Sequence, residues 1–428
     1  MRYRSSVMRY FFILGTNAVL SAAEISALLD SRDFTVTEMD KQAMIVTGMP
    51  GKTIDAAAMM RRLGGTIKIG EITGEDLPID ASALTEHIVE QLAPRVTSKG
   101  NATFGISIYS LEAIATTNKA AIISGKYKNV GMEVKRRLKE GGHAVRWVKA
   151  QAGPTLTSVA VEKNKMIEEG GEFVVLAKKD VMYVGKTLVV QPFEEFSLVD
   201  YGRPERDTVQ GMLPPKLTRI MINLANISSD AAMLDPFCGS GTVLTEALQM
   251  GFTTMFGSDK NPKAVQDTEK NITWLREKKI IAADAGHVTL YPCDAREIAN
   301  KLEAKSVDAI ITEPYLGPPR TGREKRGEIQ KTLSDLSKLY YESLSAWKKI
   351  LKPNACIVIA LPVYISGTEK HGVQSAAFIP PGYVTEPLLP VPVLSRLGAN
   401  ETKNHGLLYG RNNQYVWREI VRLRLAES

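Results

Sequence analysis

The chain has 428 residues, 44% of them hydrophobic, so it is long enough to form two or three domains, each with its own core. No uninterrupted apolar run approaches the roughly 18 residues of a membrane-spanning helix, so no membrane partner is expected. A formal charge of +7 is compatible with nucleic-acid binding, but it excludes few protein classes by itself.

The three cysteines, Cys238, Cys293 and Cys356, lie far apart and show no paired ligand spacing. This pattern predicts neither a disulfide framework nor a zinc cluster, and we expect no metal site. Arg2 and Arg4 are not followed by a long apolar segment, so no secretory signal is expected. We therefore expect the reducing environment of the cytoplasm.

The first 75 residues alternate between strand-like and helix-like patterns in the order β-α-β-β-α-β, which predicts a ferredoxin-like domain over residues 1–75. Ser21 and Glu24 have the spacing of a capping box at the start of the first helix. The segments on which this prediction depends are a strand from Tyr10, a helix over 20–29, a strand at Ala43–Val46, a helix at Thr53–Leu63 and a strand from Ile67.

A second small α/β domain is predicted over residues 76–195. One of its helices, around 131–140, is basic, which is typical either of a nucleic-acid surface or of an ordinary solvated face. The predicted elements are a helix at 81–92, a strand at 103–109, the basic helix with Lys135, Arg136, Arg137 and Lys139, and strands at 145–148, 172–177 and 182–191.

The main domain boundary is predicted between Pro192 and Pro215, where four prolines and many charges are typical of a surface linker. We assign residues 196–225 to this linker and to the start of a ligand pocket. Residues 226–428 then alternate regularly between strands and helices. Strands ending at Asp235, Asp259, Asp294 and Thr312 predict parallel βαβ units and a Rossmann-like, doubly wound sheet.

The strongest motif is Asp235-Pro236-Phe237-Cys238-Gly239-Ser240-Gly241-Thr242, located where a buried strand turns into a helix. Gly239 and Gly241 allow the backbone to pass close to a ligand. Leu244 occupies the position of the third glycine of a dinucleotide fingerprint, which weakens that interpretation. The carboxylate of Asp235 suits an ammonium group, such as that of S-adenosyl-L-methionine.

Two further acidic residues end the next strands. Asp259 is positioned to bind a ribose diol, and Asp294, followed by Ala295, could accept a hydrogen bond from an adenine amino group. A single Asp at a strand end is as often a helix cap as a ligand, but three in succession favour a ligand site. The predicted cofactor residues are Asp235, Phe237, Gly239, Gly241, Thr242, Asp259, Asp294 and Ala295.

The fourth strand leads into Thr312-Glu313-Pro314-Tyr315, which resembles the D/N-P-P-Y/F motif of methyltransferases that modify exocyclic amines of bases. In that motif an acidic or amide side chain accepts hydrogen bonds from the amine, and the aromatic ring stacks on the base. Here Thr312 and Glu313 replace the first two residues. Either Glu313 acts as the acceptor or the site is impaired. The alternative for Tyr315 is that its ring serves only for packing. These four residues are the candidate catalytic residues.

Several segments together resemble the THUMP-domain tRNA (guanosine-10 N2) methyltransferases of archaeal type. F-F-I-L-G near the N-terminus is similar to the ferredoxin-like extension of that family. V-G-M-E-V-K-R-R-L and Y-V-G-K-T-L-V-V-Q are similar to its THUMP domain, and D-P-F-C-G-S-G-T to its cofactor motif. Arg203-Pro204, G-M-L-P-P-K-L at 211–217 and N-Q-Y-V-W-R-E-I-V at 413–421 also match.

This resemblance implies S-adenosylmethionine-dependent methylation of the N2 amine of a guanosine in tRNA, at position 10. It implies tRNA as partner, leaves a small activating subunit open, and assigns residues 76–195 to a THUMP domain. Two alternatives stay open. One is a DNA adenine-N6 or cytosine-N4 methyltransferase, although no target-recognition insertion is evident. The other is a non-catalytic RNA-binding protein with the same fold, although its cofactor residues would then be retained without use.

Overall fold

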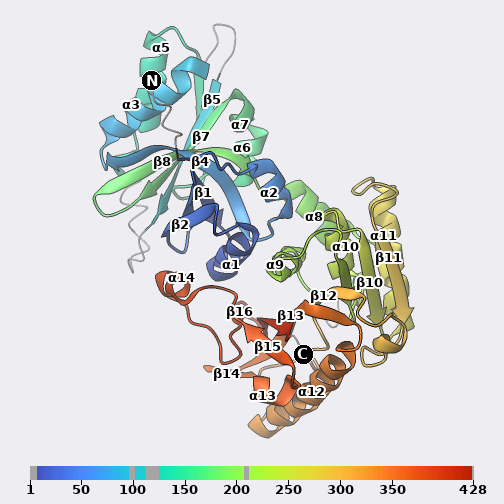
Figure 1. Ribbon diagram of the computed structural model, residues 1–428. Coiled ribbons are helices and arrows are strands. Elements are labelled where there is room, and N and C mark those ends of the chain that lie inside the picture. Colours follow the sequence, from blue (N-terminus) through green and yellow to red (C-terminus); the bar gives the residue numbers. More distant parts are fainter. Residues whose placement is uncertain (1–6, 96–101, 112–124, 207–211, 427–428) are drawn as a thin grey trace.

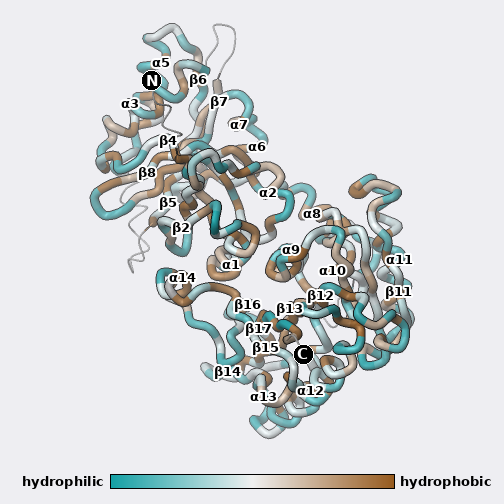
Figure 2. Tube along the Cα trace, viewed as in Figure 1, coloured by the Kyte–Doolittle hydropathy of each residue, from teal (hydrophilic) through white to brown (hydrophobic). Residues whose placement is uncertain are grey.

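The computed structural model describes residues 7–95, 102–111, 125–206 and 212–426. The chain forms two lobes, each built around one mixed sheet, and the segment containing α8 (Phe193–Gly202) and α9 (Pro215–Ala225) connects them (Figure 1). Hydrophobic residues concentrate along α9 and along the central strands of each lobe (Figure 2). Arg2, Arg4 and Gly211, which were used in the sequence analysis, lie outside the described residues.

The N-terminal lobe contains an eight-stranded sheet in the order β2-β3-β1-β4-β8-β7-β5-β6. Its strands are β1 (Arg9–Leu14), β2 (Phe34–Met39), β3 (Ala43–Gly48), β4 (Thr66–Pro78), β5 (Ala102–Ser110), β6 (Val145–Val148), β7 (Gly170–Ala177) and β8 (Val181–Val190). Its helices are α1 (Ala18–Leu28), α2 (Ala56–Arg62), α3 (Ala81–Leu92), α5 (Val130–Glu140), α6 (Ser158–Lys163) and α7 (Met166–Glu169), with a 3₁₀ turn at Ala93–Arg95.

The elements of residues 9–78 follow the predicted β-α-β-β-α-β order, and their strand order β2-β3-β1-β4 is that of a ferredoxin-like unit. Long β4 pairs antiparallel with β8, so the sheet continues into residues 102–190 without a break. The expected division at residue 75 lies within β4, and the separation into two domains stays a prediction.

The predicted capping box of the first helix is wrong. Asn17 caps α1 by accepting a hydrogen bond from the Leu20 amide, four residues before the expected cap Ser21. Ser21 and Glu24 are buried inside the helix, and the Glu24 carboxylate accepts hydrogen bonds from the amides of Gly64 and Gly65, at 2.8 Å each. The local spacing therefore reflects a tertiary contact, which a local pattern does not distinguish from a cap.

The C-terminal lobe contains a sheet in the order β11-β10-β9-β12-β13-β17-β15. Its strands are β9 (Ala232–Asp235), β10 (Thr254–Asp259), β11 (His287–Pro292), β12 (Val307–Thr312), β13 (Leu351–Ser366), β15 (Tyr383–Glu386) and β17 (Val416–Leu425), with β14 (Glu369–Gly372) and β16 (Leu407–Tyr409) added at its side. Its helices are α10 (Thr242–Gln249), α11 (Pro262–Glu277), α12 (Arg326–Trp347), α13 (Ser375–Phe378) and α14 (Val391–Arg396), with a 3₁₀ turn at Ile298–Asn300.

The five strands from β11 to β13 are parallel, and β17 pairs antiparallel with β13. This confirms the predicted Rossmann-like sheet. The chain reverses its order between β9 and β12, which is the point where ligands bind in doubly wound sheets. The carboxyl ends of β9, β10 and β12 therefore face a common crevice.

Part of the segment predicted as a linker is ordered structure. Residues 193–202 form α8, and Arg203, which is buried, donates a hydrogen bond to the Thr242 hydroxyl at 2.9 Å. Helix α9 packs against α1 and α10, and one continuous core includes residues of both lobes. Prolines at 192, 204, 214 and 215 thus mark helix boundaries, because proline fits the first turn of a helix as well as a loop.

Candidate active site

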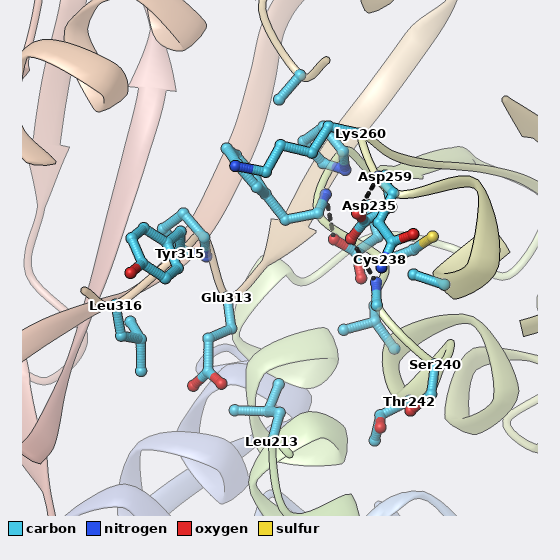
Figure 3. A pocket seen from close by; sticks show the side chains of 18 of the residues that line it. Leu213, Asp235, Cys238, Ser240, Thr242, Asp259, Lys260, Glu313, Tyr315 and Leu316 are labelled. Carbon is cyan, nitrogen blue, oxygen red and sulfur yellow. Dashed lines mark hydrogen bonds between the residues drawn. The ribbon is translucent and has the colours of Figure 1, made fainter. Parts of the chain in front are cut away.

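A cavity of about 470 Å³ lies at the carboxyl ends of the parallel strands, a volume typical of small-molecule sites. Figure 3 shows the side chains of Asp235, Asp259, Glu313 and Tyr315 around this cavity. The predicted site residues that line it are Asp235, Phe237, Gly239, Thr242, Asp259, Asp294, Ala295, Glu313, Pro314 and Tyr315. Met212, Leu213 and Lys260 also line it. Gly241 and Thr312 lie outside this lining.

The glycine-rich turn between β9 and α10 forms the floor of the cavity. Gly239 has φ +52°, and a methyl group at its Cα would project into open space, so the backbone here is accessible to a ligand. Gly241, with φ +85°, begins α10, and a Cβ there would lie 2.7 Å from the Thr268 side chain. The two glycines thus have different tasks: Gly239 leaves room for a ligand, and Gly241 leaves room for α11.

Asp235 ends β9 and is 2% exposed. Its Oδ1 atom accepts hydrogen bonds from the Thr312 hydroxyl at 2.7 Å and from the Phe237 amide at 3.1 Å. Burial raises the pKa of Asp235 to about 7, because desolvation disfavours the carboxylate more than these hydrogen bonds favour it. A cation in the cavity would stabilise the ionised form.

Asp259 ends β10, whereas β11 ends at Pro292, so Asp294 lies two residues beyond its strand and not at the predicted strand end. Asp259 accepts a hydrogen bond from the Gly239 amide at 3.1 Å, so it also fixes the glycine-rich turn. Asp294 forms an ion pair with Arg296 at 2.9 Å, and this hydrogen-bonded partner lowers the pKa of Asp294. Arg296 was missed in the sequence because its partner is two residues away in a turn.

The T-E-P-Y segment places its two unusual residues differently. Thr312 is the last residue of β12, is fully buried, and uses its hydroxyl to bind Asp235. Glu313 is the first residue beyond the strand, and its carboxylate faces the cavity. Of the two, Glu313 lines the cavity directly, whereas Thr312 is connected to it through Asp235.

Two buried tyrosines, missed in the sequence, hold the backbone beyond Glu313. Tyr340 of α12 donates to the Tyr315 carbonyl at 2.6 Å, and Tyr364 of β13 donates to the Leu316 carbonyl at 2.5 Å. Tyr315 itself is 42% exposed at the mouth of the cavity. Its ring is therefore available for stacking, while its backbone is fixed.

A second cavity of about 500 Å³ lies on the other side of Tyr315. The two cavities share the walls formed by Met212, Tyr315, Leu316 and Gly317. The remaining wall of the second cavity includes Tyr409, Arg411, Gln414 and Arg418. Gln414 and Arg418 belong to the segment 413–421, which was noted in the sequence only as a family match.

The comparisons with known proteins agree with this geometry. Residues 203–366 match the RMKL-like methyltransferase domain family. The crystal structure of TrmN from Thermus thermophilus aligns with 97% of this chain and 99% of its own, with a TM-score of 0.52 at 15% identity, which indicates a shared fold. The strand order, the cavity and the matched domain define a Rossmann-like methyltransferase.

Two archaeal relatives specify the family. The tRNA (guanine(10)-N2)-dimethyltransferase of Methanocaldococcus jannaschii is 33% identical over 156 residues, which cover 36% of this chain and 38% of the relative. The probable tRNA (guanine(10)-N2)-dimethyltransferase of Methanothermococcus thermolithotrophicus is 30% identical over 124 residues, which cover 29% of this chain and 74% of that relative. The chain belongs to this family, which confirms the family expected from the sequence.

The matched regions are limited in extent. The aligned part spans 38% of the Methanocaldococcus jannaschii relative and 40% of the one from Methanothermobacter thermautotrophicus.

In the described ranges no helix is long and apolar enough to cross a membrane. The same ranges contain no group of three or more His, Cys, Asp or Glu side chains that could hold a metal ion.

Proposed function

We propose that the protein transfers a methyl group from S-adenosyl-L-methionine to the exocyclic N2 amine of a guanosine in tRNA, at position 10. The observation that carries this proposal is the placement of the Glu313 carboxylate. It faces the same cavity as Asp235 and Asp259, so an acceptor for a base amine and the groups for a cationic nucleoside cofactor share one site.

The residues of the first cavity suit S-adenosylmethionine. Asp235 would hold the ammonium of its methionine part, Asp259 its ribose hydroxyls, and Asp294 with Ala295 the adenine edge beside Phe237. Gly239 would give the ligand access to the backbone. When bound, this cofactor supplies an electrophilic methyl group on a sulfonium centre.

The chain's own contribution is to orient a weak nucleophile. The lone pair of an amine on guanine is conjugated with the ring, so the amine reacts only when it is held in the correct geometry. Glu313 would accept the hydrogen bonds of the amine and align its lone pair with the methyl group. It would then take up the proton that the amine loses, or pass it to solvent.

The second cavity is suited to the base. A guanosine must leave the tRNA stack to reach the site, which costs a few kcal/mol, and stacking on the exposed Tyr315 ring would return part of that energy. Because Tyr315 and Leu316 line both cavities, a base there would lie directly beside the cofactor.

The N-terminal lobe would hold the body of the tRNA. In α5, Arg136 and Arg137 form ion pairs with Glu133, so they are less free for phosphates than the sequence suggests. Lys135 and Lys139 of the same helix are exposed. We assign phosphate contacts to these two lysines, in the region predicted as a THUMP domain.

The test is mass spectrometry of nucleosides from tRNA transcripts incubated with the purified full chain and methyl-labelled cofactor. We expect N2-methylated guanosine, which is lost when guanosine 10 is replaced by adenosine. Activity of the chain alone would also show that an activating subunit is not required. Methylated adenine or cytosine in DNA, with no product in tRNA, would support the DNA alternative instead.

A further inference from the structure

We propose that Arg418 is a positioning residue for methyl transfer: it orients the Glu313 carboxylate across the wall between the two cavities. This inference rests on the proposed function and adds to it a residue 105 positions away from the T-E-P-Y segment. The family match over 413–421 includes Arg418 but gives it no role.

The contact is a two-pronged ion pair. The Arg418 Nε atom donates to one Glu313 oxygen, and Nη2 donates to the other at 3.2 Å. The side chains are only 11% and 13% exposed, so the pair is largely shielded from solvent. A bidentate guanidinium fixes the plane of a carboxylate as well as its position.

The location of the pair is unusual. Glu313 lines the first cavity and Arg418 lines the second, so the ion pair crosses the partition between them. Arg418 lies on β17, where it is in register with Pro362 of β13 and Tyr409 of β16. A residue in the middle of a three-strand arrangement has little freedom, and it therefore provides a rigid anchor for the loop after β12.

The electrostatic surroundings make Glu313 dependent on this cation. Burial first, and the Glu313 charge in addition, raise the pKa values of Asp235 and of the Tyr340 hydroxyl. In the part of the chain that the structure describes, Arg418 is the one cation in ion-pair contact with Glu313. Without Arg418, a mostly buried carboxylate would lack its ion-pair partner, which is costly.

The Glu313 carboxylate has enough acceptor sites to bind guanine and Arg418 at the same time. A carboxylate has about four lone-pair sites, and Arg418 occupies one on each oxygen. The remaining sites can accept the two donors that guanine presents side by side, the ring N–H and the exocyclic amine. A carboxylate whose plane is no longer fixed by Arg418 would present these sites in poor alignment, so the transfer step would require the guanidinium.

An ion pair that serves only stability should not affect methyl transfer, and β17 contains such a pair. Arg424 lies on the same strand and pairs with Glu386 of β15 through 2.6 Å and 3.0 Å hydrogen bonds, away from both cavities. It provides a matched control: loss of either arginine removes a bidentate ion pair of β17, but only Arg418 contacts the site. We expect Arg424→Ala to affect thermal stability without changing the rate of transfer.

The experiment is single-turnover methyl transfer to tRNA at saturating cofactor and tRNA, with cofactor and tRNA affinities measured in parallel, for the parent, Arg418→Ala, Arg418→Lys and Arg424→Ala. For Arg418→Ala we expect a loss of rate of roughly tenfold or more with both affinities unchanged. Arg418→Lys should recover part of this rate and remain several-fold below the parent, because a lysine lacks the guanidinium fork. In a Glu313→Gln background, Arg418→Ala should cause little further loss.

An Arg418→Ala protein with the transfer rate of the parent would overturn the inference. If that variant does not fold, Arg418→Lys decides: a rate equal to that of the parent contradicts a positioning role, and a several-fold loss with unchanged cofactor affinity supports it. Absence of any transfer by the parent would contradict the proposed function itself, which separates the two failures.

Discussion

At the scale of single residues, Asp235 links cofactor binding to pH. Its pKa of about 7 means that the free protein carries a largely protonated group at mildly acidic pH. A bound ammonium favours the carboxylate, so affinity for S-adenosylmethionine should rise as the pH increases from about 6 to 8. Binding should then release a proton from Asp235 to the buffer. Calorimetry in two buffers of different ionisation enthalpy measures both effects.

The control for this prediction is Asp235→Asn, which has no titrating group at that position. It should bind the cofactor more weakly and without the same pH dependence. If the affinity of the parent is constant across this pH range, then the ammonium is bound elsewhere.

Thr312 and Glu313 should differ in what their substitution changes. Glu313→Gln should retain cofactor and tRNA binding but lower the single-turnover rate about 100-fold, because the carboxylate acts mainly in the transition state. Thr312→Ala removes a hydrogen bond to Asp235 and should weaken cofactor binding, by about 0.5 to 1.5 kcal/mol.

Thr312→Ser keeps the hydroxyl and serves as the control for Thr312→Ala. Parallel binding and rate measurements on the three variants separate the two roles. A Thr312→Ala protein with normal cofactor affinity but a strongly reduced rate would exchange the assignments of Thr312 and Glu313.

At the scale of elements, the loop after β12 depends on α12 and β13. Tyr340→Phe and Tyr364→Phe each remove a hydroxyl that holds a loop carbonyl, and we expect slower transfer with little change in thermal stability. Tyr383→Phe is the matched control, because its hydroxyl donates to the Leu344 carbonyl within the same lobe. Equal rates for all three variants would show that the loop does not need these anchors.

In the C-terminal sheet, the sequence predicts a strand well where a buried apolar run ends in a polar residue. β9, β10 and β12 have the bounds expected from apolar runs that end in a polar residue, at 232–235, 254–259 and 307–312. The same signal identifies Asp235 and Asp259, because function places polar groups at strand ends. Helix α8 is missed, since prolines and charges are shared by linkers and by helix boundaries.

At the scale of the whole molecule, Glu24 and Asn223 connect the lobes. Asn223 of α9 donates to the Glu24 carboxylate at 2.8 Å, and burial raises the pKa of Glu24 to about 7 from an ordinary value near 4.5. The folded state then binds more protons than the unfolded state between these values, so stability falls as pH rises through this window.

Glu24→Gln cannot titrate, and it provides the comparison. We expect the parent to be more stable relative to Glu24→Gln at pH 5 than at pH 8, measured by thermal denaturation midpoints. A difference between the two proteins that does not change with pH would show that Glu24 is not neutral in the folded state near pH 5.

Long-range pairings of this kind are what the sequence does not reveal. Glu24 meets Asn223 across 199 positions, and Glu313 meets Arg418 across 105. Each residue taken alone has the local pattern of a helix or strand residue. Only the folded arrangement shows that one pair connects the lobes and the other spans two cavities.

The central claim is that Glu313 and the cavities beside it present the N2 amine of guanosine for methylation. The most direct measurement compares tRNA carrying guanosine at the modified position with tRNA carrying inosine there, a base that lacks only this amine. We expect methyl transfer to the guanosine form and none to the inosine form, with similar binding of both. Methylation of the inosine-containing tRNA at that position would contradict the account.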